Sequence, residues 1–152
     1  MKLRRLRIRN FRCFQNETAI EFDDVTALVG KNDSGKSTIM EALDLFLNEG
    51  NPDKDDASKA GDAKDLTIIC EFSDLPHAVV IDEDYPTSLS AEFLVNQDGC
   101  LEIHKNYSGH LQAPKCSSIE AFAIHPNADG VKDLLQLKNA DLKKRAKDRA
   151  ST

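Results

Sequence analysis

The sequence predicts an α/β fold with a mixed parallel and antiparallel sheet. One strand of this sheet leads into a glycine-rich loop and a helix. Three observations support this class. Residues 3–11 alternate apolar and basic side chains, as a strand with one buried face does. Residues 25–29 (VTALV) form an apolar run that is typical of a strand buried on both faces. Residues 37–47 repeat apolar side chains at helical spacing, which predicts a helix after the loop with these side chains facing a core, namely Ile39, Met40, Leu43, Phe46 and Leu47.

Length and composition are those of one globular domain. The 152 residues are enough to enclose a hydrophobic core, and 40% hydrophobic with 30% charged residues is an ordinary balance for such a domain. No apolar run approaches the roughly 20 residues of a membrane span, and no apolar segment follows the basic first residues as in a signal peptide. The four cysteines are scattered without a zinc-site spacing, so we expect reduced thiols in a cytoplasmic protein.

The charge is unevenly distributed along the chain. The net charge of −6 excludes a uniformly basic protein. The first twelve residues are nevertheless rich in basic side chains, namely Lys2, Arg4, Arg5, Arg7, Arg9 and Arg12. Two interpretations remain open. These arginines are either the solvated face of an edge strand, where charge prevents edge-to-edge pairing, or a surface that follows a phosphate backbone.

Other elements are less specific to function. Residues 19–22 predict a short strand, and residues 48–65 are polar and rich in acidic residues, which predicts a mobile surface loop. Antiparallel strands are expected over about 66–125, at residues 66–72, 89–95, 100–107 and 119–124, with Asn96-Gln97-Asp98-Gly99 as a hairpin turn. A C-terminal helix is expected over about 131–150, with few contacts past Asp141 because its apolar stripe ends there.

The most specific motif is the stretch GKNDSGKST, which fits G-x-x-x-x-G-K-[S/T] without a mismatch. A glycine-rich loop between a strand and a helix presents backbone N–H groups to an anion at the positive end of the helix. The motif therefore predicts a site for nucleotide phosphates. The predicted binding residues are Gly30, Lys31, Asn32, Asp33, Ser34, Gly35, Lys36, Ser37 and Thr38.

Each part of this loop has an expected role. The N–H groups from Asn32 to Lys36 converge on the β-phosphate, and the Lys36 ammonium neutralises the β- and γ-phosphates. The Ser37 hydroxyl is expected to coordinate Mg²⁺, and Thr38 to reach the α-phosphate. The N-K-x-D and D-x-x-G motifs that GTPases need do not occur in the chain, so ATP is the expected nucleotide.

A carboxylate that supports hydrolysis should end an apolar strand close to this loop. The stretch AVVIDE at residues 78–83 has that form, with Asp82 and Glu83 at its end. We interpret it as a loop region, because Pro76 and Pro86 bracket it and no second parallel βα unit follows. The sequence therefore leaves the catalytic residues unassigned.

The first 48 residues resemble a known group. The stretches LRIRNFRCFQNETAIEF and VTALVGKNDSGKSTIMEALDLFL are similar to the opening of ABC-type ATPases of the structural-maintenance-of-chromosomes (SMC) and RecF class. Within that class they look most like the overcoming-lysogenization-defect (OLD) family, whose members join such an ATPase to a C-terminal Toprim nuclease and in several cases act against phage. The resemblance implies ATP and Mg²⁺ as cofactors. It also makes Arg12, in the matching N-F-R segment, a candidate phosphate contact.

The resemblance also shows which parts of such an ATPase have no counterpart here. A signature loop of the L-S-G-G-Q type, a D-loop and the acidic clusters of a Toprim domain do not occur in residues 1–152. The chain is therefore expected to be the first lobe of an ATPase head, leading to a second lobe. Expected partners are a second copy or other ATPase subunits, with nucleic acid a partner of the full-length protein.

Two functions from different classes follow. The leading hypothesis is the ATP-binding part of an OLD-like ATPase and endonuclease in anti-phage defence or DNA repair. The alternative is a nucleotide-binding sensor or assembly module with little or no hydrolysis. A small P-loop kinase is disfavoured, because residues 48–65 offer acidic side chains where phosphoryl-transfer enzymes use arginines.

Overall fold

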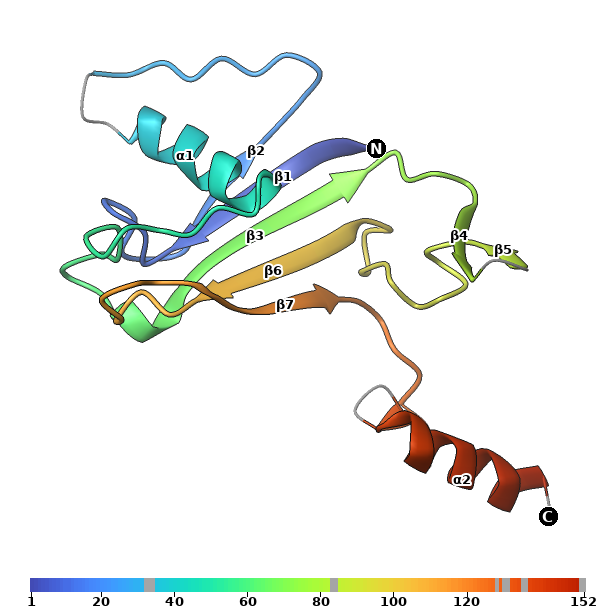
Figure 1. Ribbon diagram of the computed structural model, residues 1–152. Coiled ribbons are helices and arrows are strands. Elements are labelled where there is room, and N and C mark those ends of the chain that lie inside the picture. The colour runs from blue at the N-terminus through green and yellow to red at the C-terminus, as the bar shows by residue number, and fades with distance from the viewer. Residues whose placement is uncertain (32–34, 83–84, 128, 130–131, 135–136, 151–152) are drawn as a thin grey trace.

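The computed structural model describes residues 1–31, 35–82, 85–127, 129, 132–134 and 137–150. In chain order the elements are β1 (Lys2–Arg9), β2 (Thr18–Glu21), α1 (Lys36–Leu47), the 3-10 turn η1 (Ala63–Asp65), β3 (Leu66–Ser73), β4 (Val79–Asp82), β5 (Tyr85–Thr87), β6 (Leu101–Tyr107), β7 (Cys116–Phe122) and α2 (Asn139–Ala150). Five strands form one sheet in the order β2-β1-β3-β6-β7, and β4 pairs with β5 separately. Helix α1 lies across one face of the larger sheet (Figure 1). The predicted α/β class is confirmed.

Strand β3 is the centre of the larger sheet. It pairs antiparallel with β1 on one side and with β6 on the other, and the outer pairs β1–β2 and β6–β7 are antiparallel as well. Its residues Leu66 to Phe72 are all buried. The strand predicted over 66–72 is therefore confirmed, and its burial follows from its place between two neighbours and under α1.

Strand β1 is an inner strand, because β2 and β3 flank it on both sides. The interpretation of its arginines as the face of an edge strand is therefore wrong. Leu6 and Ile8 are fully buried in the core, whereas Arg5 and Arg7 extend from the opposite face toward acidic side chains of neighbouring strands. The alternation in the sequence separates an apolar face from an ion-paired face rather than a core from water.

The hydrophobic core lies between α1 and the sheet. Its buried members are Leu6, Ile8, Phe11, Ile39, Ala42, Phe46, Leu66, Ile68, Cys70, Phe72 and Tyr107. On α1, Ile39 and Phe46 are buried and Leu43 packs against the cluster, as predicted. Met40 and Leu47 are 58% and 59% exposed, so the prediction that they also face the core is wrong. They lie on the side of the helix that no second layer covers in the described chain.

The far end of α1 is tied to β6. The Nζ atom of Lys105 donates to the carbonyl oxygen of Phe46 at 2.8 Å and lies 5.0 Å from the centre of the Phe46 ring. The Tyr107 hydroxyl donates to the carbonyl oxygen of Leu45 at 3.4 Å. Because α1 has no basic residue in its last turn, the Lys105 ammonium supplies the positive charge that a helix C-terminus favours. These contacts set the position of α1 on the sheet.

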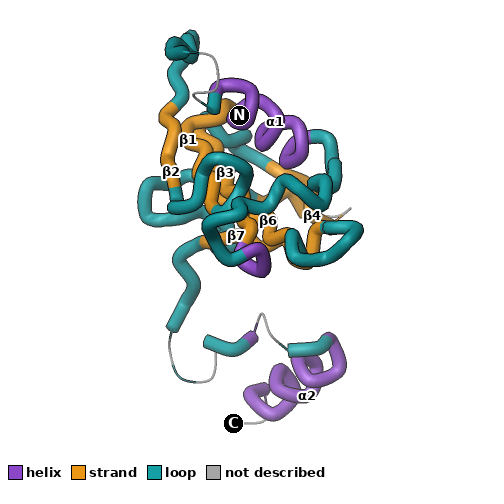
Figure 2. Tube along the Cα trace, turned by 90° about the vertical axis from the view of Figure 1, so that its left-hand side faces the viewer, coloured by secondary structure: helices purple, strands orange, loops and turns teal. Residues whose placement is uncertain are grey.

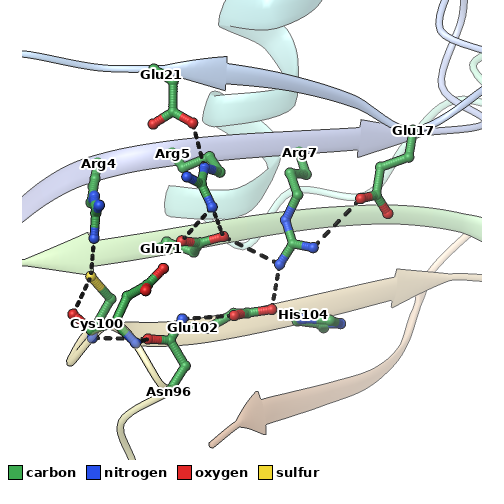
Figure 3. A network of polar contacts seen from close by, with 11 residues as sticks. Arg4, Arg5, Arg7, Glu17, Glu21, Glu71, Asn96, Cys100, Glu102 and His104 are labelled. Carbon is green, nitrogen blue, oxygen red and sulfur yellow. Dashed lines mark hydrogen bonds and ion pairs between the residues drawn. The ribbon is translucent and has the colours of Figure 1, made fainter.

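Ion pairs line the opposite face of the sheet (Figure 3). Arg5 donates to Glu21 at 2.5 Å and to both carboxylate oxygens of Glu71 at 3.3 Å. Arg7 lies 3.3 Å from Glu71 and also donates to Glu102. Glu71 is only 2% exposed, and a buried carboxylate requires such partners. Carboxylates on β2, β3 and β6 therefore hold Arg5 and Arg7, and the hypothesis that these arginines follow a phosphate backbone gains no support.

Residues 25–29 are not a strand, contrary to the prediction. Val25 and Val29 are 90% and 92% exposed, whereas Leu28 packs against the hydrophobic core, and the segment between β2 and α1 lies outside the sheet (Figure 1). The apolar pattern predicts burial on both faces, but none of the described strands lies beside this segment. The described strand pairs of the larger sheet are antiparallel. A parallel pairing would have to include residues 25–29, and it would need strands other than those described.

The polar stretch 48–65 is largely a loop, as predicted, but it is held against the end of β1. The backbone N–H of Ser58 donates to the carbonyl oxygen of Asn10 at 2.9 Å, and that of Arg12 donates to Asp56 at 2.6 Å. Asp56 and Ser58 are buried. The expectation of a mobile insert is therefore wrong for its middle part. Composition alone does not reveal that the turn after β1 offers partners for these backbone groups.

The predicted hairpin around residues 96–99 is only half formed. Strand β6 is present, and the backbone N–H of Asn96 donates to the carbonyl oxygen of Cys100 at 2.8 Å, which closes the turn. Residues 89–95 form turns instead of the other strand. The Ser88 hydroxyl accepts from the N–H of Ala91 at 3.1 Å, and this local bond replaces strand pairing. The strand predicted over 119–124 is present as β7, shifted toward the N-terminus.

Helix α2 begins at Asn139, later than the predicted start at residue 131, and residues 132–134 form turns. It stands away from the sheet in both views (Figures 1 and 2). Its Arg145 donates to nearby Asp133 at 2.5 Å. The prediction of few contacts past Asp141 is confirmed. Neither described α-helix has the length and apolar character needed to cross a membrane.

Candidate nucleotide-binding site

The predicted phosphate loop leads into the start of α1. Gly30 and Lys31 are exposed, residues 32–34 lie outside the described residues, and Gly35 directly precedes the helix. The Lys36 side chain folds back over the loop, since its Nζ donates to the carbonyl oxygens of Gly30 at 2.7 Å and Lys31 at 2.5 Å. The ammonium thus lies at the mouth of the loop, where a lysine must be to meet nucleotide phosphates.

Gly35 lets the loop and the helix meet in a small space. Its φ angle of 86° is in the left-handed region that favours glycine. A Cβ atom at this position would lie 3.0 Å from Cζ of Phe14 and 3.1 Å from Sγ of Cys13. Both the backbone angle and the neighbouring atoms therefore select glycine, and the turn after β1 packs directly against the start of α1.

The first turn of α1 is suited to an anion. It contains no acidic residue, and no side chain caps the helix at Gly35. Its backbone N–H groups and the helix dipole therefore favour negative charge at this end. Ser37 is exposed, whereas Thr38 is buried toward the turn after β1.

Mg²⁺ would depend on the nucleotide as much as on the protein. In the part of the chain that the structure describes, no group of three or more His, Cys, Asp or Glu side chains could hold a metal ion. The exposed Ser37 hydroxyl fits one position of a Mg²⁺ ion whose other oxygen ligands come from phosphates and water. The residues present therefore fit the expected Mg²⁺ as a companion of ATP.

Cys13 is a neighbour of the site that sequence reasoning missed. Its Sγ lies 4.0 Å from Oγ1 of Thr38, and its side chain is exposed. The signal was available, because Cys13 directly follows Arg12 in the N-F-R segment. The structure thus places the Cys13 thiol beside Thr38, the residue predicted to reach the α-phosphate.

Arg12 lies beside α1 and is bound by acidic side chains. Its Nε donates to Oδ1 of Asp56 at 2.7 Å, and its terminal nitrogen pairs with Glu41. Glu41 is one helical turn beyond Ser37, so the guanidinium lies near the beginning of the helix. Burial by itself would lower the pKa of Arg12. The hydrogen bond to Asp56 and the charges of Asp56 and Glu41 outweigh burial, so the pKa of Arg12 is raised above its usual value. The guanidinium is therefore cationic.

The acidic stretch AVVIDE does not reach the phosphate loop. Strand β4, which ends at Asp82, forms a small antiparallel hairpin with β5, and Glu83 lies outside the described residues. The hairpin lies beyond the end of the sheet that is remote from the start of α1 (Figure 1). The stretch is thus a short hairpin rather than the expected loop, and it is not a strand beside the phosphate loop.

Known proteins share about a third of the chain. It is 48% identical over 50 residues to the chromosome partition protein Smc of Halobacteriovorax marinus, which is 32% of this chain and 4% of that protein. It is 43% identical over 47 residues to the OLD nuclease of Thermus scotoductus, which is 31% of this chain and 9% of that protein. It is 38% identical over 50 residues to a structural maintenance of chromosomes protein 3 homolog of Plasmodium falciparum, which is 32% of this chain and 4% of that protein. The chain spans less than a tenth of the length of these curated relatives.

One solved structure is similar over nearly the full length. It comes from work on ATP-driven dimerization and DNA-stimulated activation of SMC ATPases, and it aligns with a TM-score of 0.49 and 15% identity over 97% of this chain and 99% of that one. The family model described as AAA ATPase domain matches residues 1–152. Because this match covers every residue, the chain belongs to the AAA ATPase domain family, with SMC and OLD proteins among its relatives.

Proposed function

We propose that this chain is the ATP-binding lobe of an OLD-like ATPase that is coupled to an endonuclease and acts in anti-phage defence or DNA repair. The observation that carries ATP binding is the position of the Lys36 ammonium, which lies over the carbonyl oxygens of Gly30 and Lys31 at the start of α1. Support for the OLD-like part is the 43% identity to the Thermus scotoductus OLD nuclease over 47 residues.

In this proposal the described residues bind and orient the nucleotide. The Lys36 ammonium would exchange the two carbonyl oxygens for the β- and γ-phosphates, and the N–H groups at the start of α1 would hold the phosphates at the positive end of the helix. The Ser37 hydroxyl holds Mg²⁺, which neutralises phosphate charge when it is bound. Thr38 would face the α-phosphate, and Cys13 would lie beside it, since their side chains are 4.0 Å apart.

A second lobe completes the site. Residues 25–29 lead directly into the loop and have four apolar residues among five, yet Val25 and Val29 are almost fully exposed. Apolar strands of this kind are stable only when other strands cover them. The proposed second lobe would add strands beside residues 25–29 and bring the carboxylate that supports hydrolysis. A second copy or another ATPase subunit would then close the active site, and nucleic acid would bind to the complete assembly.

A second candidate function is a nucleotide-binding sensor or assembly module. The observation that favours it is the position of the β4–β5 hairpin, which keeps the acidic stretch remote from α1 (Figure 1). ATP binding would then order the interface around residues 25–29 without turnover. The two candidates differ in hydrolysis by the assembled protein, not in nucleotide binding by this chain.

The test of ATP binding is isothermal titration of the chain with Mg²⁺ and the non-hydrolysable analogue AMP-PNP. Lys36→Ala should weaken binding at least about tenfold, because a charge-assisted contact to phosphate is lost. Lys64→Ala is the matched control, since it removes the same charge from an exposed lysine of η1 that lies outside the predicted binding residues. Equal affinity of the wild type and the Lys36→Ala variant would contradict the assignment.

The test of the catalytic part is phosphate release by the chain alone. We expect turnover well below roughly 1 s⁻¹, the lower end of typical enzyme rates, because no carboxylate strand lies beside the loop among the described residues. Turnover at ordinary rates, abolished by Glu83→Gln, would show that residues 78–83 are catalytic after all. Addition of a second lobe or subunit that restores turnover would favour the ATPase over the sensor.

A further inference from the structure

The turn after β1 is held in an uncommon conformation by the loop between α1 and β3. Asn10 and Arg12 have φ angles of 55° and 49°, in the left-handed region that non-glycine residues seldom adopt. The loop supplies backbone bonds from Ser58 to Asn10 at 2.9 Å and from Arg12 to Asp56 at 2.6 Å. The conformation of the turn therefore depends on its contact with the loop.

The Arg12 side chain closes this contact. Its guanidinium lies between Asp56, which is part of the loop, and Glu41, which is part of the helix that follows the phosphate loop. The Asp56 side chain is 11% exposed, and its second carboxylate oxygen accepts from the backbone N–H of Asp53 at 2.8 Å. Asp56 is thus fixed by the loop itself, whereas Arg12 is a long side chain that can change partners.

The same guanidinium borders the proposed nucleotide site. Glu41 is one turn along α1 from Ser37, and the residue after Arg12 is Cys13, whose Sγ lies 4.0 Å from Thr38. A cavity of about 460 Å³ between the turn and the loop is lined in part by Arg12 and Cys13, which leaves room for the guanidinium to move. A phosphate group carries more negative charge than one carboxylate and offers arginine a bidentate contact.

We propose that Asp56 and Glu41 compete with nucleotide phosphates for Arg12, so that nucleotide binding loosens the loop of residues 51–62 from the turn after β1. This inference rests on the proposed ATP site and adds a regulatory contact to it. In the nucleotide-free chain the two carboxylates hold Arg12 and keep the loop attached. When phosphates bind Arg12, the side-chain part of that attachment is lost, and the loop is held to the turn by its backbone hydrogen bonds alone.

The experiment measures AMP-PNP affinity with Mg²⁺ in four variants of the full chain. Asp56→Asn removes the competing charge and should tighten binding about 1.5- to fivefold, the range that corresponds to one partly exposed ion pair. Arg12→Ala should weaken binding, and adding Asp56→Asn to it should have no further effect. Asp55→Asn is the matched control, because Asp55 is an exposed carboxylate of the same loop and the ion pairs of Arg12 go to Asp56 and Glu41.

A second readout follows the loop directly. Lys54 and Lys59 are exposed in it, so trypsin should cleave there faster when AMP-PNP and Mg²⁺ are present. Weaker binding by Asp56→Asn, equal tightening in the Arg12→Ala background, or slower cleavage with nucleotide would each overturn the competition. If the wild type binds AMP-PNP in a Lys36-dependent way but Asp56→Asn has no effect, only this inference fails. If the wild type does not bind at all, the proposed function fails first.

Discussion

The backbone of Gly35 lies against the ring of Phe14, so that a methyl group on Gly35 would stand 3.0 Å from Cζ of Phe14. This contact joins the turn after β1 to the first residue before α1. It explains why the phosphate loop and the N-F-R segment, which residues 13–29 separate in the sequence, form one structural unit.

Gly35→Ala should destabilise the chain by about 2–4 kcal/mol, from left-handed strain together with overlap in a packed site. Gly99→Ala is the matched control, because Gly99 also has a positive φ angle of 70° but has no atom within 4 Å of an added Cβ. We expect that variant to lose only about 1–2 kcal/mol. Urea unfolding followed by circular dichroism measures both values. Equal losses would show that contact with the turn after β1 does not matter.

Nucleotide should protect Cys13 from alkylation. Cys13 is exposed, whereas Cys70 and Cys100 are buried. Burial also raises the pKa of the Cys70 thiol to about 12, although the charge of Lys105 opposes this shift. Iodoacetamide should therefore react first with Cys13 near neutral pH. AMP-PNP with Mg²⁺ should slow this reaction, since Cys13 lies beside Thr38. Mass spectrometry of the labelled peptides gives the rates.

A Cys13→Ser variant should lack the fast phase of alkylation altogether. If the fast phase persists in this variant, another thiol is the reactive one. If the fast phase belongs to Cys13 but is insensitive to saturating nucleotide, the α-phosphate does not lie on this side of α1.

Stability should fall in acid partly through Glu102. Burial alone would raise the pKa of Glu102, but His104, Asn96 and Arg7 together lower it below its ordinary value of 4.5. Because the folded state has the lower pKa, the stabilisation is present above about pH 4.5 and is lost as the pH falls through the lowered folded value. Wild type should therefore exceed Glu102→Gln in stability at neutral pH, and the difference should shrink in acid.

Denaturant unfolding at several pH values measures this difference, with Glu49→Gln as the control for loss of one exposed carboxylate. A stability gap between wild type and Glu102→Gln that is constant from neutral to acid pH would show that the charge of Glu102 contributes nothing, and that only its shape and hydrogen bonds matter.

Removal of α2 should leave the rest of the fold intact. The helix stands away from the sheet, and its ion pair between Arg145 and Asp133 is partly exposed on both sides (Figure 1). Such a pair contributes about 0–1 kcal/mol. A chain that ends at residue 138 should therefore unfold within about 1 kcal/mol of the full chain in urea. A larger loss would place α2 against the sheet in solution.

Several features were determined by the sequence itself, because their causes are local. The alternation in residues 3–11 predicts β1, and the helical spacing of Ile39, Leu43 and Phe46 predicts the buried side of α1. The pattern of glycine, lysine and serine at residues 30–38 predicts a phosphate loop, and the left-handed φ angle of Gly35 agrees with the need for glycine there. Backbone angles and side-chain periodicity depend on near neighbours in the chain.

Only the tertiary structure decided which groups meet across long intervals. It made β1 an inner strand with its arginines bound to Glu71 and Glu102, and it brought Asp56 to Arg12, 44 residues away. It also left Val25 exposed, although its segment has the composition of a buried strand. Burial and ion pairing are properties of pairs of segments, and their free energy depends on which partner is present. A local pattern states that a surface is apolar or charged, but not what covers it.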